Sequence, residues 1–348
     1  MRRGFFLLST SMFIILMSCD KVSDTQYPDK YPIELGVEWS SVASENLSHN
    51  DSRAIEVTEQ NISDFGVLAY YEDGSFNAAS STPNFMDNVK VRKSGSQWVY
   101  NPLMYWPVSG TVSFFAYAPF DVSDVNYLSV STLGMPTYTY TQPNVVKSQR
   151  DLLLSYPMID KTKSDVNANN KLPLKFRHAL SSVVFKAYVM LAQTDPVKVT
   201  SITLQSLRNK KKASFIAVPI NETYPHGWQL SWSDVADYTD NNYDLSIANG
   251  CLYDTDIKNN TAPINISTVD GQLMLLPQII DDTDKIIVMT TIGSETKTKE
   301  ISLKSIIPVF ETGKRYTISI KIVSKVDVDI ICTVTPWRVN VIDVPEFN

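Results

Sequence analysis

The chain has 348 residues with a formal net charge of −6, and 43% of its residues are hydrophobic. This apolar content excludes a wholly disordered protein, and the acidic balance leaves no basic stripe that would predict a nucleic-acid partner. Single hydrophobic cores tend to divide beyond about 250–300 residues, so we expect two domains.

Residues 1–18 have the pattern of a bacterial export signal. Arg2 and Arg3 precede an apolar run from Phe5 to Met17 that is too short to cross a bilayer comfortably as a helix. The end of this run, Leu16-Met17-Ser18-Cys19, resembles a lipoprotein box. In such a box the cysteine thiol receives a diacylglyceryl group and the freed amine receives an acyl chain such as palmitate, so Cys19 would hold the mature protein on a membrane. The alternative is an ordinary cleaved signal peptide with a coincidental cysteine.

The segment after the leader contains a tether, one strand and one loop. Residues 19–32 are charged, contain proline and lack an apolar period, which predicts a flexible tether. The polar stretch from Ser40 to Arg53 predicts a loop open to a protease. Between them, a period of two predicts a half-buried strand whose apolar positions are Ile33, Leu35, Val37 and Trp39.

From Phe65 onward, short runs of strand-forming residues are separated by turn residues, and no segment shows a sustained helical period. This spacing predicts an all-β protein with an antiparallel sandwich or barrel architecture instead of alternating βαβ units. The polar window at 161–170 is predicted to link an N-terminal domain (33–160) to a C-terminal domain (171–348).

The second half repeats the strand pattern around a looser middle. Ser233 to Asn265 is rich in Asp and Asn and is predicted to run over the surface, with room for a short helix. Residues 338–348 are strand-forming but not cleanly amphipathic, because Val339 and Val341 share one face while Ile342 and Val344 share the other.

Residue patterns typical of catalysis or metal binding are missing from the sequence. The three histidines, His49, His178 and His226, lie far from one another and from the cysteines after Cys19. His178 sits between apolar residues and is interpreted as structural. The run Asp281-Asp282-Thr283-Asp284 is interpreted as a solvated loop, with a weak calcium site as the alternative. We therefore expect no enzyme activity, no cofactor and no metal.

The two cysteines after Cys19 leave alternatives open. Cys251 and Cys332 are 81 positions apart, which does not prove contact. They either form a disulfide, as an exported protein permits, or remain two separate buried thiols.

Aromatic residues are dense between positions 98 and 117. Alternating aromatic residues on strands most often form sheet core. The alternative is a platform on which sugar rings stack, since export would place the protein near glycans. The residues concerned are Trp98, Tyr100, Tyr105, Trp106, Phe114, Phe115 and Tyr117.

Several short motifs in a fixed order resemble the fimbrillin family of anaerobic Gram-negative bacteria, particularly its Mfa-like branch. The most specific is Tyr105-Trp106-Pro107 followed by Gly110 and the run from Val112 to Pro119. The others cover nearly the whole mature chain: Ser52-Arg53-Ala54, Phe65 to Tyr70, Asp151-Leu152-Leu153, Leu174 to Phe185, and Val334-Thr335-Pro336-Trp337.

The resemblance implies two tandem transthyretin-like β-sandwich domains in a protein exported as a lipoprotein to the outer membrane. In that family an arginine-specific protease cuts after the first strand, and a strand of another subunit fills the groove that is left. By position, the cut would lie between Arg53 and Ala54, and the strand with Ile33 and Trp39 would be removed within residues 33–53. The donor strand would contain Val339, Val341, Ile342, Val344 and Phe347.

The sequence therefore predicts two alternative functions. The first is a structural subunit of surface fimbriae that supports cell adhesion, with copies of itself or related fimbrial subunits as partners. Such a subunit would be exposed on the cell outer membrane and would enter the fimbrium after processing. The rival is a monomeric outer-membrane lipoprotein that binds glycans or host ligands through exposed aromatic residues.

Overall fold

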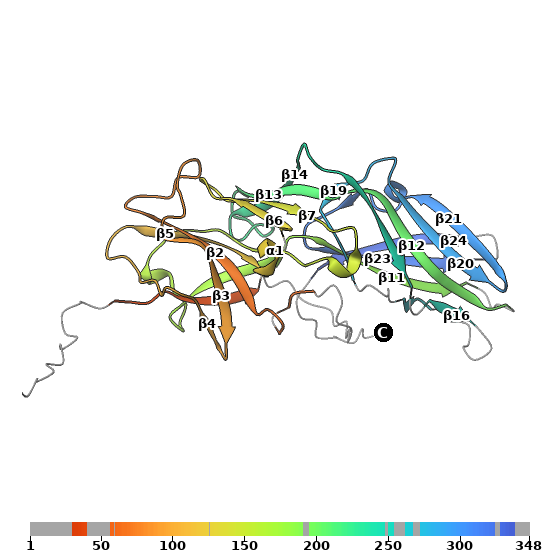
Figure 1. Ribbon diagram of the computed structural model, residues 1–348, viewed down its shortest axis with the longest axis horizontal. Helices are drawn as coiled ribbons and strands as arrows, with labels where there is room; N and C mark the ends of the chain where they lie inside the picture. Colours follow the sequence, from red (N-terminus) through yellow and green to blue (C-terminus); the bar gives the residue numbers. More distant parts are fainter. Residues whose placement is uncertain are drawn as a thin grey trace, which may run out of the picture.

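The structure is a computed structural model that describes residues 30–39, 56–58, 60–124, 126–190, 195–247, 250–253, 262–266, 272–323 and 328–337 (Figure 1). These residues are mostly in β-strands. Their only α-helix is the single turn α1 (Asp121–Asp124), beside the short 3-10 helices η1 (Val146–Ser148), η2 (Lys163–Asp165) and η3 (Leu303–Ser305). The all-β prediction is confirmed, whereas the tandem transthyretin-like arrangement stays a prediction.

The first sheet curls around its own core. Its two end strands, β1 and β4, contact each other, so the sheet nearly closes. The core inside includes Ile33, Phe65, Phe114 and Phe176, all fully buried. The order along the sheet is β1 (Glu34–Trp39), β10 (Lys171–His178), β8 (Leu153–Ser155), β5 (Thr111–Ala118), β2 (Asp64–Glu72), β3 (Met86–Ser94) and β4 (Gln97–Val99), with β9 (Met158–Lys161) beside β5.

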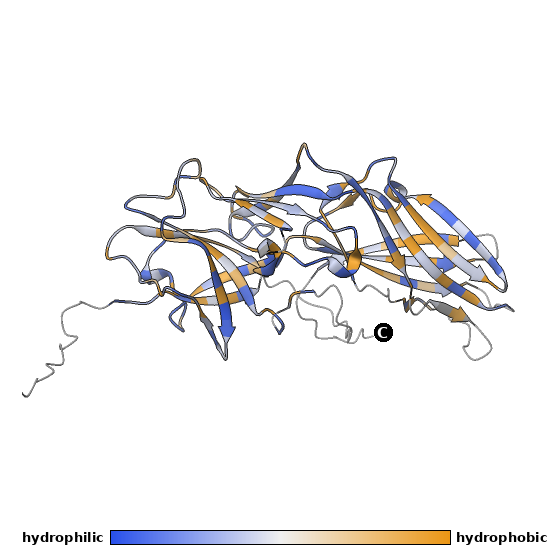
Figure 2. Ribbon diagram, viewed as in Figure 1, coloured by the Kyte–Doolittle hydropathy of each residue, from blue (hydrophilic) through white to orange (hydrophobic). Residues whose placement is uncertain are grey.

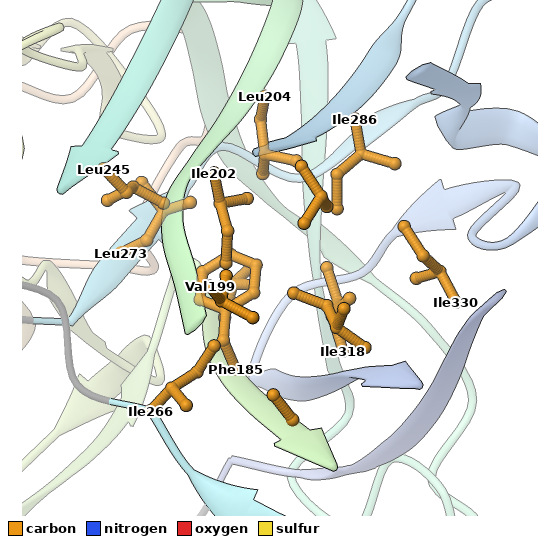
Figure 3. Close-up of a cluster of buried hydrophobic side chains, with 14 of the residues drawn as sticks. Phe185, Val199, Ile202, Leu204, Leu245, Ile266, Leu273, Ile286, Ile318 and Ile330 are labelled. Carbon is orange, nitrogen blue, oxygen red and sulfur yellow. The ribbon is translucent and has the colours of Figure 1, made fainter. Parts of the chain in front are cut away.

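Two further sheets face each other in the second half of the chain and enclose a mostly aliphatic core that includes Phe185 (Figure 3). One sheet contains β17 (Ile264–Asn265), β18 (Leu273–Leu275), β11 (Ser181–Val189), β23 (Lys314–Ile322) and β24 (Val328–Pro336). The other contains β15 (Asp240–Ser246), β16 (Cys251–Tyr253), β12 (Val197–Arg208), β20 (Lys285–Ile292) and β21 (Glu295–Ser302).

A four-stranded sheet joins the two halves of the molecule. Its strands come from both sides of residue 170 and cover a third core that contains Tyr117, Tyr138, Phe215 and Trp337. The order is β14 (Trp228–Asp234), β13 (Lys210–Ala217), β7 (Thr137–Thr141) and β6 (Leu128–Ser131). A small pair of strands, β19 (Gln278–Ile279) and β22 (Val309–Phe310), completes the fold.

Alternating burial explains why these segments form strands. In β10 the side chains of Leu172, Leu174 and Phe176 are fully buried, while those between them are half-buried. Such a period of two places one row of apolar side chains on the core face of a pleated strand. Figure 2 shows apolar residues gathered along the strands and hydrophilic residues in many of the connecting loops.

Two expectations about chain organisation need correction. Residues 161–170 connect β9 to β10 within one sheet, so the expected linker does not coincide with a change of sheet. The polar residues of this window form a connection within the sheet, since the next strand, β10, pairs with β8 and β1. The stretch from Ser233 to Asn265 contains β15, in which Tyr243 and Leu245 are buried between outward-facing polar residues. The strand was not predicted because Asp and Asn, which are typical of loops, occupy most of the positions around these two apolar residues.

Candidate functional site

The candidate site is the edge of the first sheet that β1 occupies. β1 runs parallel to β10, in a register from Glu34 opposite Lys171 to Trp39 opposite Phe176. Ile33 and Leu35 are fully buried in the first core, and Val37 and Trp39 pack against it half-buried. The predicted strand is therefore present, and all four of its apolar side chains reach the core.

The two ends of β1 differ on the edge that faces away from β10. The Ile33 amide donates a hydrogen bond to the Met104 carbonyl (2.9 Å), and the Tyr100 hydroxyl donates one to the Ile33 carbonyl (2.7 Å). Toward the other end, the described residues supply no backbone partner on that edge for Val37 or Trp39. The strand is thus held on both edges at its start and on one edge at its end.

A cleft of about 390 Å³ lies beside the loosely held end of β1. Gly36, Val37 and Glu38 form one wall, and Lys93 and Trp98 of the β3–β4 hairpin contribute to the other. The indole nitrogen of Trp39 is shielded from solvent and has no hydrogen-bond partner among the residues that the structure describes. A buried N–H group without a hydrogen-bond acceptor lowers the stability of the strand end that carries it.

A cluster of polar side chains lies at the C-terminal end of β10, around His178. The Glu56 carboxylate accepts hydrogen bonds from the Arg315 guanidinium (2.8 Å) and from the Trp337 indole nitrogen (2.7 Å). The Trp337 ring stacks on the His178 ring, with centroids 4.0 Å apart and planes 6° apart. Glu56, β23 and the end of β24 are therefore fastened together.

Asp151 extends this cluster into the first sheet. One of its carboxylate oxygens lies 2.9 Å from His178 Nδ1 and accepts a hydrogen bond from the Val57 amide (3.0 Å). Asp151 is fully buried, and His178 Nε2 lies 3.9 Å from Glu56. Because buried charges need partners, the cluster fixes residues 56 and 57 at the junction of the two halves.

The remaining predicted site residues lie outside the described residues. These are Cys19, Arg53 and Ala54, and the donor residues Val339, Val341, Ile342, Val344 and Phe347. The segments that flank them are described: Glu56 follows Arg53 by three positions, and Trp337 precedes Val339 by two. The direct hydrogen bond between Glu56 and Trp337 brings these two flanks together.

Sequence reasoning missed the polar cluster. Glu56, Asp151 and Arg315 are separated by up to 259 positions, so no local pattern links them. The only local signal is that Glu56 lies within the otherwise apolar run Ala54-Ile55-Glu56-Val57.

The aromatic residues between 98 and 117 form core. Trp106, Phe114, Phe115 and Tyr117 are buried, and Trp98 and Tyr100 pack half-buried against the first core. Tyr105 is the exception, with 40% of its surface exposed. The interpretation as sheet core is confirmed, and these seven residues do not form an exposed sugar-stacking platform.

The acidic run 281–284 is an ion-paired loop. Asp281 pairs with Arg208 (2.7 Å), Asp282 pairs with Lys304 (2.9 Å), and the Asp281 amide donates to the buried Asp284 carboxylate. Burial raises the pKa of Asp284. The described residues contain no group of three or more His, Cys, Asp or Glu side chains that could hold a metal ion.

Two smaller findings concern the cysteines and membrane helices. Cys332 is a free thiol on β24, half-buried, and burial raises its pKa to about 11. Within the described ranges, none of the helices is long and apolar enough to span a bilayer.

Comparison with known proteins identifies the family. The sequence profile described as fimbrillin-like matches residues 52–337, which is most of the chain. The chain belongs to the fimbrillin-like family. The match begins one residue before Arg53 and ends at Trp337, the residue that precedes the C-terminal segment 338–348.

The first of three similar solved structures shares the fold. A fimbrial protein from Bacteroides vulgatus has 18% identity and a TM-score of 0.57, and the alignment covers 88% of this chain and 99% of that one. A protein described as a cell adhesion protein from Bacteroides uniformis has 15% identity, a TM-score of 0.49 and coverage of 88% and 99%. The fimbrial anchor protein Mfa2 from Porphyromonas gingivalis has 10% identity, a TM-score of 0.37 and coverage of 90% and 100%. No curated protein matches the sequence.

Proposed function

We propose that this protein is a structural subunit of cell-surface fimbriae that is exported as a lipoprotein and polymerises by protease-triggered donor-strand exchange. Membership of the fimbrillin-like family supports a fimbrial, non-enzymatic role at the cell surface. The leader that ends at Cys19 supports delivery to the outer membrane.

One observation carries the proposal: β1 is an edge strand that fills an apolar groove and leads directly to the segment that contains Arg53. Among the residues that the structure describes, its backbone hydrogen bonds are the ladder with β10 and a few bonds near Ile33. Its loss would expose the apolar floor around Leu172 and Leu174 together with the free edge of β10. A strand from another subunit restores both the hydrogen bonds and the packing.

Head-to-tail exchange explains how such a subunit would build a filament. Each copy would present one groove and one donor segment, 339–347, so the contact between copies is heterologous and need not close. Residues 56 and 57 are fastened to Arg315, Trp337 and Asp151, so the body of the protein would keep its new N-terminus in place after the cut.

The substitution Arg53→Ala tests the proposal, with the exposed Arg92→Ala in β3 as the matched control. Wild-type and R92A surface material should begin at Ala54 and contain multimers. R53A should keep an acylated Cys19 as its N-terminus and remain monomeric. The measurements are mass spectrometry of the N-terminus on intact cells and gel analysis under mild denaturation. An identical N-terminus in R53A and wild type would overturn the proposed cut.

Deletion of residues 339–348 separates this function from the rival, a monomeric glycan-binding lipoprotein. The deletion should abolish multimers because it removes the donor segment. Retention on glycans that survives the deletion, in a protein that forms no multimers with or without residues 339–348, would instead favour the rival, for which the buried aromatic residues provide no support.

A further inference from the structure

The end of the β1 groove and the start of the C-terminal segment lie at the same place in the fold. Trp39, the last residue of β1, is in register with Phe176 of β10. His178, two residues farther along β10, stacks on Trp337. Two residues of a strand span about 7 Å. The chain therefore enters residues 338–348 close to the point at which β1 ends.

This starting point does not depend on β1. The Trp337 amide donates to the Gly313 carbonyl (2.7 Å), its indole nitrogen donates to Glu56, and only 5% of its surface is exposed. None of these partners lies in residues 30–39, and Glu56 follows the proposed cut. Removal of β1 would leave the root of the C-terminal segment in place.

The C-terminal segment is long enough to replace β1. β1 has 6 residues and spans about 20 Å. Residues 338–348 reach about 36 Å when extended, at about 3.3 Å per residue. A segment that starts near His178 could cover the whole groove with several residues to spare, and it would run antiparallel to β10 because β1 runs parallel to it.

Charge complementarity supports this segment as the occupant. In the outward-facing row of β10, Lys171 and Lys175 stand opposite Glu34 and Glu38 of β1, so removal of β1 would leave both lysines without their acidic neighbours. The C-terminal segment carries Asp343 between apolar neighbours.

The alternation of the segment fixes which face would turn inward. Burial of the Asp343 carboxylate without a partner would be costly, so Asp343 must face outward. Ile342 and Val344 then point into the groove, because neighbouring residues of a strand face opposite sides. Glu346 shares their face, but a segment that starts near His178 has passed the six positions of β1 before it reaches Glu346, so this carboxylate would lie beyond the groove. In this orientation Asp343 meets the lysine row of β10.

We propose that, once β1 has been cut away, residues 339–347 fill the groove of their own chain before they reach a second copy. This inference rests on the proposed cut at Arg53. Short flexible linkers produce effective concentrations in the millimolar range, which exceed micromolar concentrations of free subunits. The processed subunit is then a self-closed monomer, and filament growth begins only when neighbouring subunits are crowded enough to compete for the groove.

Isotope mixing with crosslinking tests the proposal. Heavy and light proteins are cut with an arginine-specific protease, checked for an Ala54 N-terminus, mixed in equal amounts at micromolar concentration and treated with a carbodiimide. This reagent joins the amine of Lys171 or Lys175 to the carboxylate of Asp343 without a spacer. The expected crosslinked peptides are heavy–heavy or light–light, from a protein that sediments as a monomer, and the uncut protein should yield none.

Three variants check the orientation. D343N should remove the crosslink. I342D should lower its yield strongly, because that residue points inward, whereas V341D should lower it much less. Equal losses in I342D and V341D would contradict the assigned face.

The outcomes separate this inference from the proposed function. Crosslinks of which half are heavy–light, in multimers, would overturn self-closure and leave donor-strand exchange standing. A crosslink in the uncut protein, or none in protein that begins at Ala54, would also overturn self-closure. Surface material that is never cut at Arg53 would instead overturn the proposed function.

Discussion

Two parallel strand pairs, β1 with β10 and β11 with β23, are held in different ways. β1 pairs with β10 at the end of the first sheet, and the described part of the chain supplies partners for its other edge only near Ile33. β23 pairs with β11 and has β24 along its entire other edge. An edge strand leaves when one ladder breaks, whereas an inner strand leaves only when two break.

The difference shows that position in the sheet, and not the parallel pairing itself, makes a strand replaceable. Both pairs bury aliphatic side chains completely, as Leu35 does in β1 and Ile318 does in β23. Apolar burial therefore stabilises both strands, but only β1 can be exchanged for another strand without opening the rest of its sheet.

The largest expected effects come from truncating these two buried side chains. Leu35→Ala and Ile318→Ala should each lower the free energy of unfolding of the uncut protein by about 2–5 kcal/mol, through lost burial and the cavity left behind. After the cut and removal of β1, only the Ile318→Ala protein should remain less stable than wild type. Denaturant unfolding of both forms measures this. A persistent deficit in cut Leu35→Ala protein would mean that the strand stays bound.

A somewhat smaller effect is expected at the junction. Arg315→Ala should lower the free energy of unfolding by about 1.5–3 kcal/mol, the range for hydrogen bonds to charged groups. The loss should be equal in the cut and uncut forms, because Glu56 follows the proposed cut. Exposed Arg92→Ala, the control, should change stability by about 0.5 kcal/mol or less. A loss confined to the uncut form would show that β1 holds the junction.

Part of this architecture follows from local sequence patterns. The alternation from Ile33 to Trp39 predicts β1 and its core-facing residues, and the spacing of strand signals predicts an all-β fold. The pairing of β1 with β10 does not follow, because the two strands are more than 130 positions apart and no local pattern encodes a non-local ladder. The ion pair between Glu56 and Arg315 could not be predicted for the same reason, because the two residues are 259 positions apart.

The next effect appears at alkaline pH and concerns one tyrosine at each strand pair. Tyr100 contacts the start of β1, and Tyr316 lies in β23. Burial raises the pKa of Tyr100 to about 12 and that of Tyr316 to about 12. The Tyr100 hydroxyl donates to Ile33 of β1, whereas the Tyr316 hydroxyl donates to Val309. Both groups favour the folded state fully below pH 10, the unfolded value, and this contribution is lost as pH rises from 10 through 12.

In a protein that lacks residues 339–348, removal of β1 should expose Tyr100 and lower its pKa toward 10, while the pKa of Tyr316 stays near 12. Titration of tyrosinate absorbance in the cut and uncut forms, with Tyr100→Phe and Tyr316→Phe to assign the signals, measures this. In the cut protein that retains residues 339–348, self-closure predicts that the titration of Tyr100 stays unchanged. A lowered pKa there would mean that the groove is left empty.

The smallest expected effect concerns the surface of the inner pair. Lys321 Nζ lies 3.5 Å from an Asp329 carboxylate oxygen across β23 and β24, and 56% of the Asp329 side chain is exposed. Exposed ion pairs contribute about 0–1 kcal/mol, so Asp329→Asn should lower the free energy of unfolding by less than about 1 kcal/mol, and the difference should shrink at high salt. A larger, salt-insensitive loss would mean that charge pairing holds β24. A small one would leave buried Ile320 and Ile330 as the residues that fasten β24, and with it Trp337, to the sheet.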